Sequence, residues 1–163
     1  MTEKEYFTEG VRSCESRMYT LALGIVQNEA DAADVMQDAI LKAYCNLDQL
    51  RDRKKFQSWI LSIVHNTAIE FLRRRKQTVD LDTQYDLEAP VLAADPATKL
   101  TVWEAIEQLP LPYRTVIILF YYDGYSVRQI VDVTAASQAA VRQQLARGRK
   151  MLAQLLKKED FEQ

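Results

Sequence analysis

The sequence predicts an all-α protein made of two small helical domains joined by an acidic linker. Only four glycines and four prolines occur among its 163 residues, which is few for a chain with many tight β turns. Apolar residues recur at helical spacing in two long stretches, separated by an acidic segment, Gln77 to Ala97, that contains Pro90 and Pro96. We therefore expect a three-helix domain over residues 1–77, a linker over 78–97, and a four-helix domain with a helix-turn-helix over 98–163.

Three helices are predicted in the N-terminal domain. Residues 3–26 carry apolar side chains at helical spacing. Asn28 is a good N-cap for a second helix that runs to about Leu47, because its side chain can accept a bond from the first turn. A third, long helix covers roughly Gln57 to Lys76.

Four more helices are predicted in the C-terminal domain. Asp95-Pro96 reads as a cap and a first-turn proline that open a helix to Gln108. Pro112 begins a helix through Tyr122, which Asp123-Gly124 ends. Ser126 caps a short helix to about Val133, and Ser137 caps a last helix to about Lys158.

The composition argues against several classes of protein. No apolar run is long enough to span a membrane, and the charged N-terminus has no signal-peptide core. Cys14 and Cys45 form neither a metal-type cluster nor a disulfide framework, so we expect reduced thiols in a cytoplasmic protein. The lone histidine, His65, has no nearby cysteine or paired carboxylate, and no glycine-rich phosphate loop occurs. We therefore expect no enzyme, no metal and no cofactor.

Charge alternates along the chain although the net charge is only −2. Residues 1–50 carry −5, residues 51–78 carry +6, residues 79–111 carry −6 and residues 112–163 carry +3. Two basic blocks could grip a polyanion at separate places while the acidic blocks face something else. The alternative is chance clustering on solvated faces.

The last predicted helix has one apolar side and one cationic side. From Val133 to Lys158 it carries six basic residues and no acidic one, whereas an ordinary solvated helix mixes signs. Glutamine, arginine and lysine beside small residues suit phosphate contacts and base-edge hydrogen bonds in a major groove. With the preceding short helix this favours a helix-turn-helix, although a plain helical hairpin stays open. The apolar side consists of Val141, Leu145, Gly148, Leu152 and Leu156, and the cationic side of Ala139, Gln143, Arg147, Lys150, Gln154 and Lys157.

The third predicted helix has an acid-free face flanked by basic runs at residues 51–55 and 73–76. Basic ends around a small polar face, with Phe56 and Trp59 nearby, resemble a groove for single-stranded nucleic acid. Asn66 and the aromatic residues could hold an unpaired base. Both aromatic residues could equally be core. The face contains Ser58, Ser62, His65, Ile69, Arg73 and Lys76, and the buried side Phe56, Ile60, Ile63, Val64 and Phe71.

The second predicted helix has an acidic face opposite its apolar side. Leu41 lies among Asp31, Asp34 and Asp38, which is odd for a free surface and natural for an interface with a basic partner. A merely solvated acidic face is the alternative. The buried side is expected to contain Val35, Met36, Ala39, Ile40, Ala43 and Leu47.

An ordered set of motifs resembles the extracytoplasmic-function (ECF) class of bacterial RNA polymerase sigma factors. The resemblance covers nearly the whole chain except the linker. The N-terminal segments are residues 19–23 (YTLAL), 29–39 (EADAADVMQDA), 56–60 (FQSWI), 64–68 (VHNTA) and 73–75 (RRR). The C-terminal segments are residues 106–110 (IEQLP), 116–119 (VIIL), 122–126 (YDGYS) and 141–152 (VRQQLARGRKML).

The resemblance implies a transcription initiation factor that binds core RNA polymerase and promoter DNA, both double- and single-stranded. In that class the second helix docks on a coiled coil of the largest polymerase subunit, here through Asp34, Gln37, Asp38 and Leu41. The third helix and its preceding loop capture the melted minus-ten strand with a flipped base, and the helix-turn-helix reads the minus-thirty-five duplex and docks on the polymerase flap. An anti-sigma protein commonly holds such factors inactive. The minus-ten set here is Leu50, Arg51, Arg53, Lys54, Lys55, Phe56, Ser58, Ser62, Asn66, Arg73 and Arg74, and the minus-thirty-five set is Ser126, Ser137, Gln138, Ala140, Arg142, Gln143, Arg147 and Lys150.

The chain departs from the family pattern at the helix-turn-helix. Ala135 replaces the usual glycine of the tight turn and tolerates a positive φ less well. Ala139-Ala140 replace a common Gly-Thr, and Gln144 stands where arginine is frequent. Two rivals stay open: a helix-turn-helix regulator that never touches polymerase, and a helical adaptor that acts through protein contacts alone.

Overall fold

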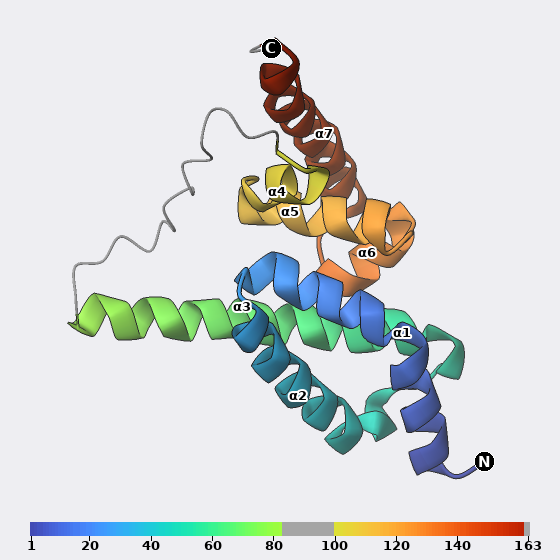
Figure 1. Ribbon diagram of the computed structural model, residues 1–163. Coiled ribbons are helices and arrows are strands. Elements are labelled where there is room, and N and C mark those ends of the chain that lie inside the picture. Colours follow the sequence, from blue (N-terminus) through green and yellow to red (C-terminus); the bar gives the residue numbers. More distant parts are fainter. Residues whose placement is uncertain (83–99, 162–163) are drawn as a thin grey trace.

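All regular secondary structure in the described residues, 1–82 and 100–161 of the computed structural model, is helical. The all-α prediction is confirmed, with three helices before the predicted linker and four after it. Most of that linker lies outside the described residues. The elements, shown in Figure 1, are α1 (Glu3–Val26), α2 (Glu29–Cys45), the 3-10 turns η1 (Leu47–Gln49) and η2 (Arg53–Lys55), α3 (Phe56–Asp82), α4 (Val102–Glu107), α5 (Leu111–Ile117), the π-helical η3 (Ile118–Tyr122), α6 (Val127–Thr134) and α7 (Gln138–Phe161).

Three of the predicted caps begin their helices where expected, and the fourth, at Asp95-Pro96, lies outside the described residues. The Asn28 side chain accepts a hydrogen bond from the Asp31 N–H at 2.9 Å. Ser126 and Gln129 form a reciprocal capping box at α6, and Ser137 Oγ accepts from the Ala140 N–H at 3.1 Å at α7. Each cap satisfies a helix N–H that has no partner within the helix.

Two helix boundaries differ clearly from the prediction, and the helix predicted from Pro112 to Tyr122 is divided into α5 and the π-helical η3. α3 continues past Lys76 to Asp82, because residues 77–82 contain neither glycine nor proline to end it. α4 begins only at Val102, since Leu100 and Thr101 are not helical. Thr101 and Glu104 form a capping box there, which starts the helix later than Asp95-Pro96 would.

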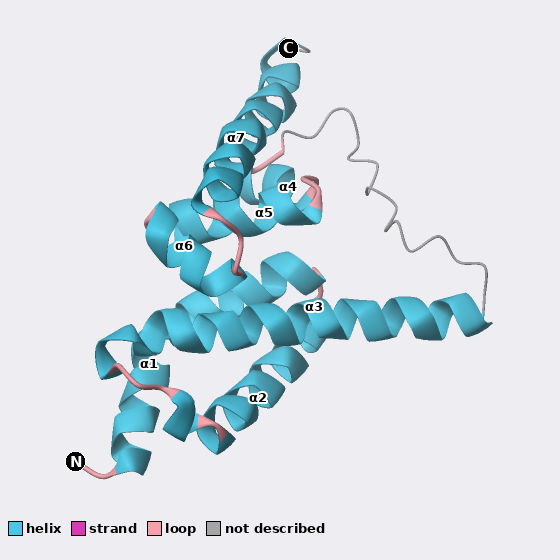
Figure 2. Cartoon of the chain, turned by 180° about the vertical axis from the view of Figure 1, so that it is seen from behind, coloured by secondary structure: helices cyan, strands magenta, loops and turns pink. Residues whose placement is uncertain are grey.

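The two halves pack against one another around a single continuous hydrophobic core. α6 lies along α3, and α5 with η3 lies on α1, so the long α3 crosses the middle of the molecule and its last turns project beyond the other helices (Figures 1 and 2). At Gly24 of α1 an added Cβ would overlap Cδ1 of Ile118 and lie 3.6 Å from Trp103, both in the second half. Side chains of the second half therefore pack directly against the backbone of α1 at Gly24.

A buried arginine ties the halves together. Arg114 of α5 donates to the carbonyl oxygens of Gly24 at 2.6 Å, Ile25 at 3.1 Å and its own domain's Leu109 at 2.9 Å. The α1 carbonyls lie in the last turn of that helix, which has no basic residue of its own and attracts a cation. Burial lowers the pKa of Arg114, with the carboxylate of Glu107 acting in the opposite direction. Beside it, Gln27 Nε2 donates to the Glu107 carbonyl at 2.7 Å.

A buried carboxyl group lies in the same interface. Asp123 is 4% exposed, and neither its Oδ2 nor the neighbouring Tyr125 hydroxyl has a hydrogen-bond partner. Burial raises the pKa of Asp123 to about 7, against the opposing effect of Arg17 on α1. Arg17 lies 5.8 Å from the Tyr125 ring centre and donates to Gln57 Oε1 of α3 at 2.9 Å.

Candidate nucleic-acid interface

The acidic face predicted on α2 is open to solvent. Asp34, Gln37 and Asp38 are exposed, and Leu41 is 62% exposed. The predicted buried side is confirmed at Val35, Met36, Ala39 and Ala43, with Ile40 and Leu47 partly buried. Asp31 differs from the rest of the acidic row, because it pairs with Arg75 of α3. Asp38 also has a salt-bridge partner, Lys42 of the same helix, but both side chains of that pair are exposed, so Asp34 and Asp38 are the carboxylates that a partner can reach.

A groove between α1 and α2 continues this face. It has a volume of about 720 Å³, and Gln37 belongs to its lining. Exposed Tyr44, next to Leu41 at helical spacing, contacts Phe7 of α1 with ring centres 5.2 Å apart. Sequence reasoning missed the α1 contribution, because it needs two helices to pack side by side. The remaining lining residues are Arg12, Glu15, Ser16, Tyr19, Ala33, Met36 and Ile40.

The basic loop before α3 is exposed and anchored from α1. Residues 51–55 are all exposed. Tyr6 donates its hydroxyl to the Arg53 carbonyl at 3.0 Å, and the Arg53 guanidinium lies 4.5 Å from the Tyr6 ring centre. Asp52 caps the η2 turn by accepting from the Lys54 N–H at 3.0 Å. The loop thus presents its cations from a fixed backbone.

The aromatic residues after the loop differ in their accessibility. Phe56 is 5% exposed and packs edge-to-face against Tyr6 and Phe7 and at a tilt against Trp59, so it has no free face to offer a base. Trp59 is only partly buried, and it lines a pocket that opens between α2 and α3. Of the two aromatic candidates, Trp59 is therefore the one that a base could reach.

That pocket brings predicted and unpredicted residues together. Its volume is about 290 Å³, and Trp59 and Asn66 are the lining residues that the sequence had singled out. α2 and the η1 turn supply an ammonium and two amides that α3 alone did not suggest. Such convergent polar groups around an aromatic wall suit a planar ligand. The unpredicted lining residues are Lys42, Asn46, Gln49, Ile63, Thr67 and Glu70.

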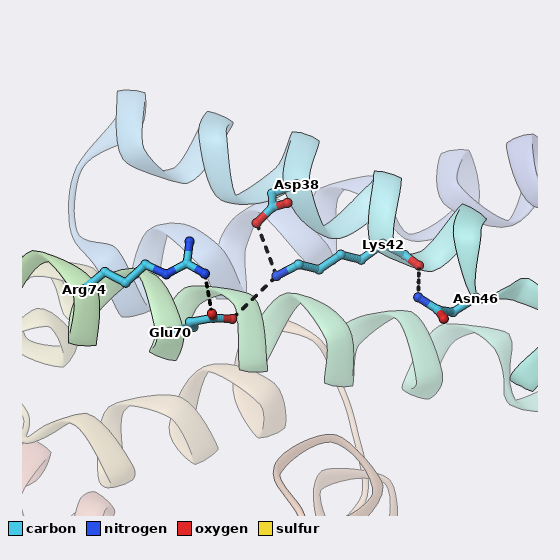
Figure 3. A network of polar contacts seen from close by, with 5 residues as sticks. All are labelled: Asp38, Lys42, Asn46, Glu70 and Arg74. Carbon is cyan, nitrogen blue, oxygen red and sulfur yellow. Dashed lines mark hydrogen bonds and ion pairs between the residues drawn. The ribbon is translucent and has the colours of Figure 1, made fainter.

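A polar network borders the pocket (Figure 3). Lys42 Nζ lies 3.3 Å from Asp38 Oδ2 and 3.6 Å from Glu70 Oε2. Glu70 also accepts from Arg74 at 2.6 Å. Asn46 Nδ2 donates to the Lys42 carbonyl at 2.8 Å, which fixes one pocket amide to the end of α2.

The acid-free face of α3 is less open than the sequence suggests. Ser58, Ser62, His65 and Ile69 are only partly exposed, whereas Asn66 and Arg73 are exposed. Burial lowers the pKa of His65, although its contact with Asn66 acts in the opposite direction. This reduced exposure accompanies the packing of α6 along α3, which no pattern within α3 could reveal.

Most of the residues predicted to contact duplex DNA from the helix-turn-helix are exposed. α6 and α7 flank a tight turn at residues 135–137, and Val141, Leu145 and Gly148 are buried as predicted. Ala140 and Gln144 are half-buried. The exposed residues of the predicted contact set are Ser126, Ser137, Gln138, Arg142, Gln143, Arg147 and Lys150.

Ala135 adopts the left-handed conformation that its position demands, with φ of +63°. Its N–H closes the helix by donating to the Val131 carbonyl at 2.8 Å. An L-residue in this region is strained by Cβ, which glycine avoids. Alanine in place of the family's usual glycine therefore keeps the geometry of the tight turn but makes its backbone strained.

Not every cation of α7 belongs to the reading face. Arg149 donates to the Tyr121 hydroxyl at 2.6 Å and lies over the rings of Phe120 and Tyr121. Arg149 was not predicted on the cationic side, but its contacts with Phe120 and Tyr121 could not be predicted from α7 alone, because η3 supplies both rings.

In the described ranges, no three histidine, cysteine, aspartate or glutamate side chains are grouped so as to hold a metal ion. No helix in those ranges is both long and apolar enough to cross a membrane.

Family models match both halves of the chain. Sigma-70 region 2 matches residues 11–78, and Sigma-70 region 4 matches residues 99–152. The first match spans the acidic face, the basic loop and the pocket, and the second spans the helix-turn-helix. Together they cover most of the chain.

Full-length relatives and solved structures agree with these matches. The chain is 29% identical to the RNA polymerase sigma factor SigV of Bacillus subtilis, over 98% of this chain and 96% of the relative. It is 29% identical to the ECF sigma factor SigW of the same organism, over 95% and 91%. In fold it resembles the sigma factor RpoE of Bartonella quintana, solved with the anti-sigma factor NepR, with a TM-score of 0.79 at 21% identity over 93% and 96% of the two chains. CnrH, solved with the cytosolic domain of CnrY, gives a TM-score of 0.70 at 22% identity over 96% and 90%. Matched in both halves and along its whole length, the chain belongs to the ECF class of RNA polymerase sigma factors.

Proposed function

We propose that this sigma factor holds core polymerase through α2, captures melted minus-ten DNA at the pocket between α2 and α3, and reads minus-thirty-five duplex with α7. The pocket carries the proposal, because it places Trp59, Asn66 and a lysine beside an exposed basic loop. The factor acts by binding, and the polymerase performs the covalent chemistry.

The polymerase-binding surface is the exposed part of α2. Asp34 and Asp38 supply charge and Leu41 supplies an apolar centre, which suits a basic partner with an apolar middle. Gln37 belongs both to this surface and to the lining of the groove between α1 and α2, so a partner helix could contact both α1 and α2. The carboxylates should speed and orient the encounter more than they hold the complex.

The minus-ten site combines a backbone grip with a base pocket. Arg51, Arg53, Lys54 and Lys55 offer phosphate contacts from the anchored loop. One unstacked base would lie against Trp59 and hydrogen-bond with Asn66. Arg73 extends the basic surface along α3, whereas Arg74 is shared with Glu70. Leu50 is partly buried at the start of this loop and Phe56 lies beneath it.

The minus-thirty-five site is the exposed side of the helix-turn-helix. Arg142, Gln143 and Arg147 can reach base edges or phosphates, and Lys150 can reach a phosphate. Ser126 and Ser137 already accept helix N–H bonds, so their hydroxyl hydrogens are the groups left for phosphate.

Promoter binding requires the two halves to separate. Elements centred ten and thirty-five base pairs upstream are about 25 base pairs apart, roughly 85 Å of duplex at about 3.4 Å per step. A compact chain of 163 residues has a radius of gyration of only about 15 Å. The contact through Arg114 and Gly24 therefore belongs to the factor before it engages the promoter.

The test is run-off transcription with purified core polymerase and a library of promoter fragments. The wild-type chain should give promoter-directed RNA, Asp34→Ala should weaken retention by core polymerase, and Arg147→Ala should weaken duplex binding at the upstream element. Trp59→Ala should reduce open-complex formation while leaving duplex binding intact. A helix-turn-helix regulator outside the polymerase system would bind duplex yet neither be retained by polymerase nor yield RNA, and that result would overturn the proposal.

A second partner is proposed from the solved relatives. RpoE was solved with the anti-sigma factor NepR and CnrH with the cytosolic domain of CnrY, and the present chain shares their fold. An inhibitor that clasps both halves would keep the interdomain contact closed. Such a protein should slow hydrogen exchange at the end of α1 and block polymerase retention. An inhibitor that blocks polymerase while exchange there accelerates would contradict this mode.

A further inference from the structure

Lys42 lies between the two surfaces of the N-terminal half. Its ammonium is 3.3 Å from Asp38 on the proposed polymerase surface and 3.6 Å from Glu70 in the wall of the proposed base pocket. Figure 3 shows the side chain lying along α2 with its nitrogen between the two carboxylates. One cation is thus shared by the polymerase face and the DNA site.

In the isolated chain this cation is neutralised. The network contains two carboxylates, Asp38 and Glu70, and two cations, Lys42 and Arg74. Both cations border a surface that we assign to a polyanion, and each is paired with a carboxylate instead. The Lys42 side chain is 40% exposed and rests on a flexible four-carbon stem, so its charge can turn to a new partner.

We propose that Lys42 is a positioning residue that couples polymerase docking to capture of the melted strand. A basic polymerase surface that takes the Asp38 carboxylate removes one of the two negative charges holding Lys42. The local charge becomes positive, and the ammonium is then available to a phosphate or base at the pocket that it lines. This inference rests on the proposed function, because it joins the polymerase and minus-ten sites assigned there.

Removing the Asp38 charge should imitate docking in the free factor. Asp38→Asn should therefore weaken polymerase binding and at the same time strengthen single-strand binding. Because the ion pair is exposed, the gain in affinity for single-stranded DNA should be about two- to fivefold at low salt and should shrink as salt is added.

The experiment uses the full chain without polymerase. Fluorescence anisotropy measures binding to a fluorescein-labelled random single-stranded DNA of about 12 nucleotides, a length within the span of known single-strand sites. Asp38→Asn should bind two- to fivefold more tightly than wild type. Glu29→Gln is the matched control, since it removes one exposed negative charge from the same helix away from Lys42. Its affinity should stay within experimental error of wild type.

A double-mutant cycle tests whether the gain in single-strand affinity comes from Lys42 or only from the change in net charge. In a Lys42→Met background the Asp38→Asn substitution should give no gain, because the cation to be released is gone. A gain that persists without Lys42, or an equal gain from Glu29→Gln, would show that only net charge matters and would overturn the inference. Circular dichroism of each variant shows whether the helices remain intact.

Polymerase pull-down distinguishes this inference from the proposed function. If Asp38→Asn loses polymerase while its single-strand affinity equals wild type, the polymerase surface stands and the coupling fails. If the wild-type chain binds neither polymerase nor single-stranded DNA, the proposed function and the coupling fail together. Weaker polymerase retention, together with tighter single-strand binding that is lost in the Lys42→Met background, supports the coupling.

Discussion

Arg114 and Lys42 each bring a cation from one helix to the next, but they do so in different surroundings. Arg114 is 8% exposed and has three carbonyl acceptors, whereas the Lys42 side chain is 40% exposed and has two carboxylates. Water screens the exposed pairs, so they contribute little to stability and can exchange partners. While the two halves stay together, the buried guanidinium cannot leave its acceptors without leaving polar groups unpaired. Burial therefore makes the Arg114 contact hold the two halves together, whereas exposure allows Lys42 to change partners when another molecule binds.

The largest effect should come from the clamp. Arg114→Met keeps much of the apolar stem but leaves the carbonyls of Gly24, Ile25 and Leu109 without this donor. We expect a loss of about 3 kcal/mol in the free energy of unfolding, measured by urea denaturation. Exposed Arg128 is the control, and Arg128→Met should change stability by less than about 0.5 kcal/mol. Equal effects of the two substitutions would break the comparison.

The next effect comes from the buried carboxyl of Asp123 and depends on pH. Its pKa is raised to about 7 in the folded chain from an ordinary value of 3.8, so the folded state binds the proton more tightly. Its contribution to stability is complete below the ordinary value and is lost as the pH rises to about 7. Relative to Asp123→Asn, the wild-type chain should lose about 2 kcal/mol of stability between about pH 5 and pH 8.

Exposed Asp132 on α6 provides the control for this pH dependence. The stability difference between wild type and Asp132→Asn should not change over the same pH range. A pH dependence that survives in Asp123→Asn would place the titrating group elsewhere.

A smaller effect should come from backbone strain at an exposed position. Ala135 has a φ of +63°, and Ala135→Gly should stabilise the chain by about 0.5–1 kcal/mol, because relief of the strain exceeds the added entropy of the unfolded glycine. Thermal denaturation measures the gain. Ala136→Gly, one residue along and without a positive φ, should destabilise by a similar amount. The opposite signs expected for Ala135→Gly and Ala136→Gly would show that an exposed residue can affect stability through backbone strain, which water does not screen.

The smallest effect on stability should come from the exposed network. Glu70→Gln removes the carboxylate shared by Lys42 and Arg74, although Lys42 keeps Asp38, and we expect a loss below about 1 kcal/mol that fades with added salt. Urea denaturation at low and high salt measures it. A salt-independent loss as large as that of Arg114→Met would mean that exposure does not decide how these charges contribute.

Local patterns predicted the helices and their buried sides well. Asn28, Ser126 and Ser137 cap helices as expected, and the apolar side of α2 is buried. These features depend on residues three or four apart, which are neighbours on one helix. The start of α4 was missed because the Thr101–Glu104 box and Asp95-Pro96 are both good starts, and sequence alone does not rank them.

The candidate site was predicted only in part, because it lies between elements. Asn66 and Trp59 were found on α3, but Lys42, Asn46 and Gln49 reach the pocket from α2 and η1. Phe56 was proposed as a contact for the melted strand and is buried among Tyr6, Phe7 and Trp59. A sequence places an aromatic residue on a face, but the neighbouring helices decide whether that face stays open.

By itself the sequence determined the helices, their caps, the alternating charge blocks and the family, since each is written in residues close together along the chain. The tertiary structure alone decided that Arg114 would clamp α1, that Asp123 would be buried beside Arg17, and that Lys42 would join two binding surfaces. The physical reason is that burial and ion pairing depend on which helices meet, and that meeting is set by packing between residues that are distant in the chain.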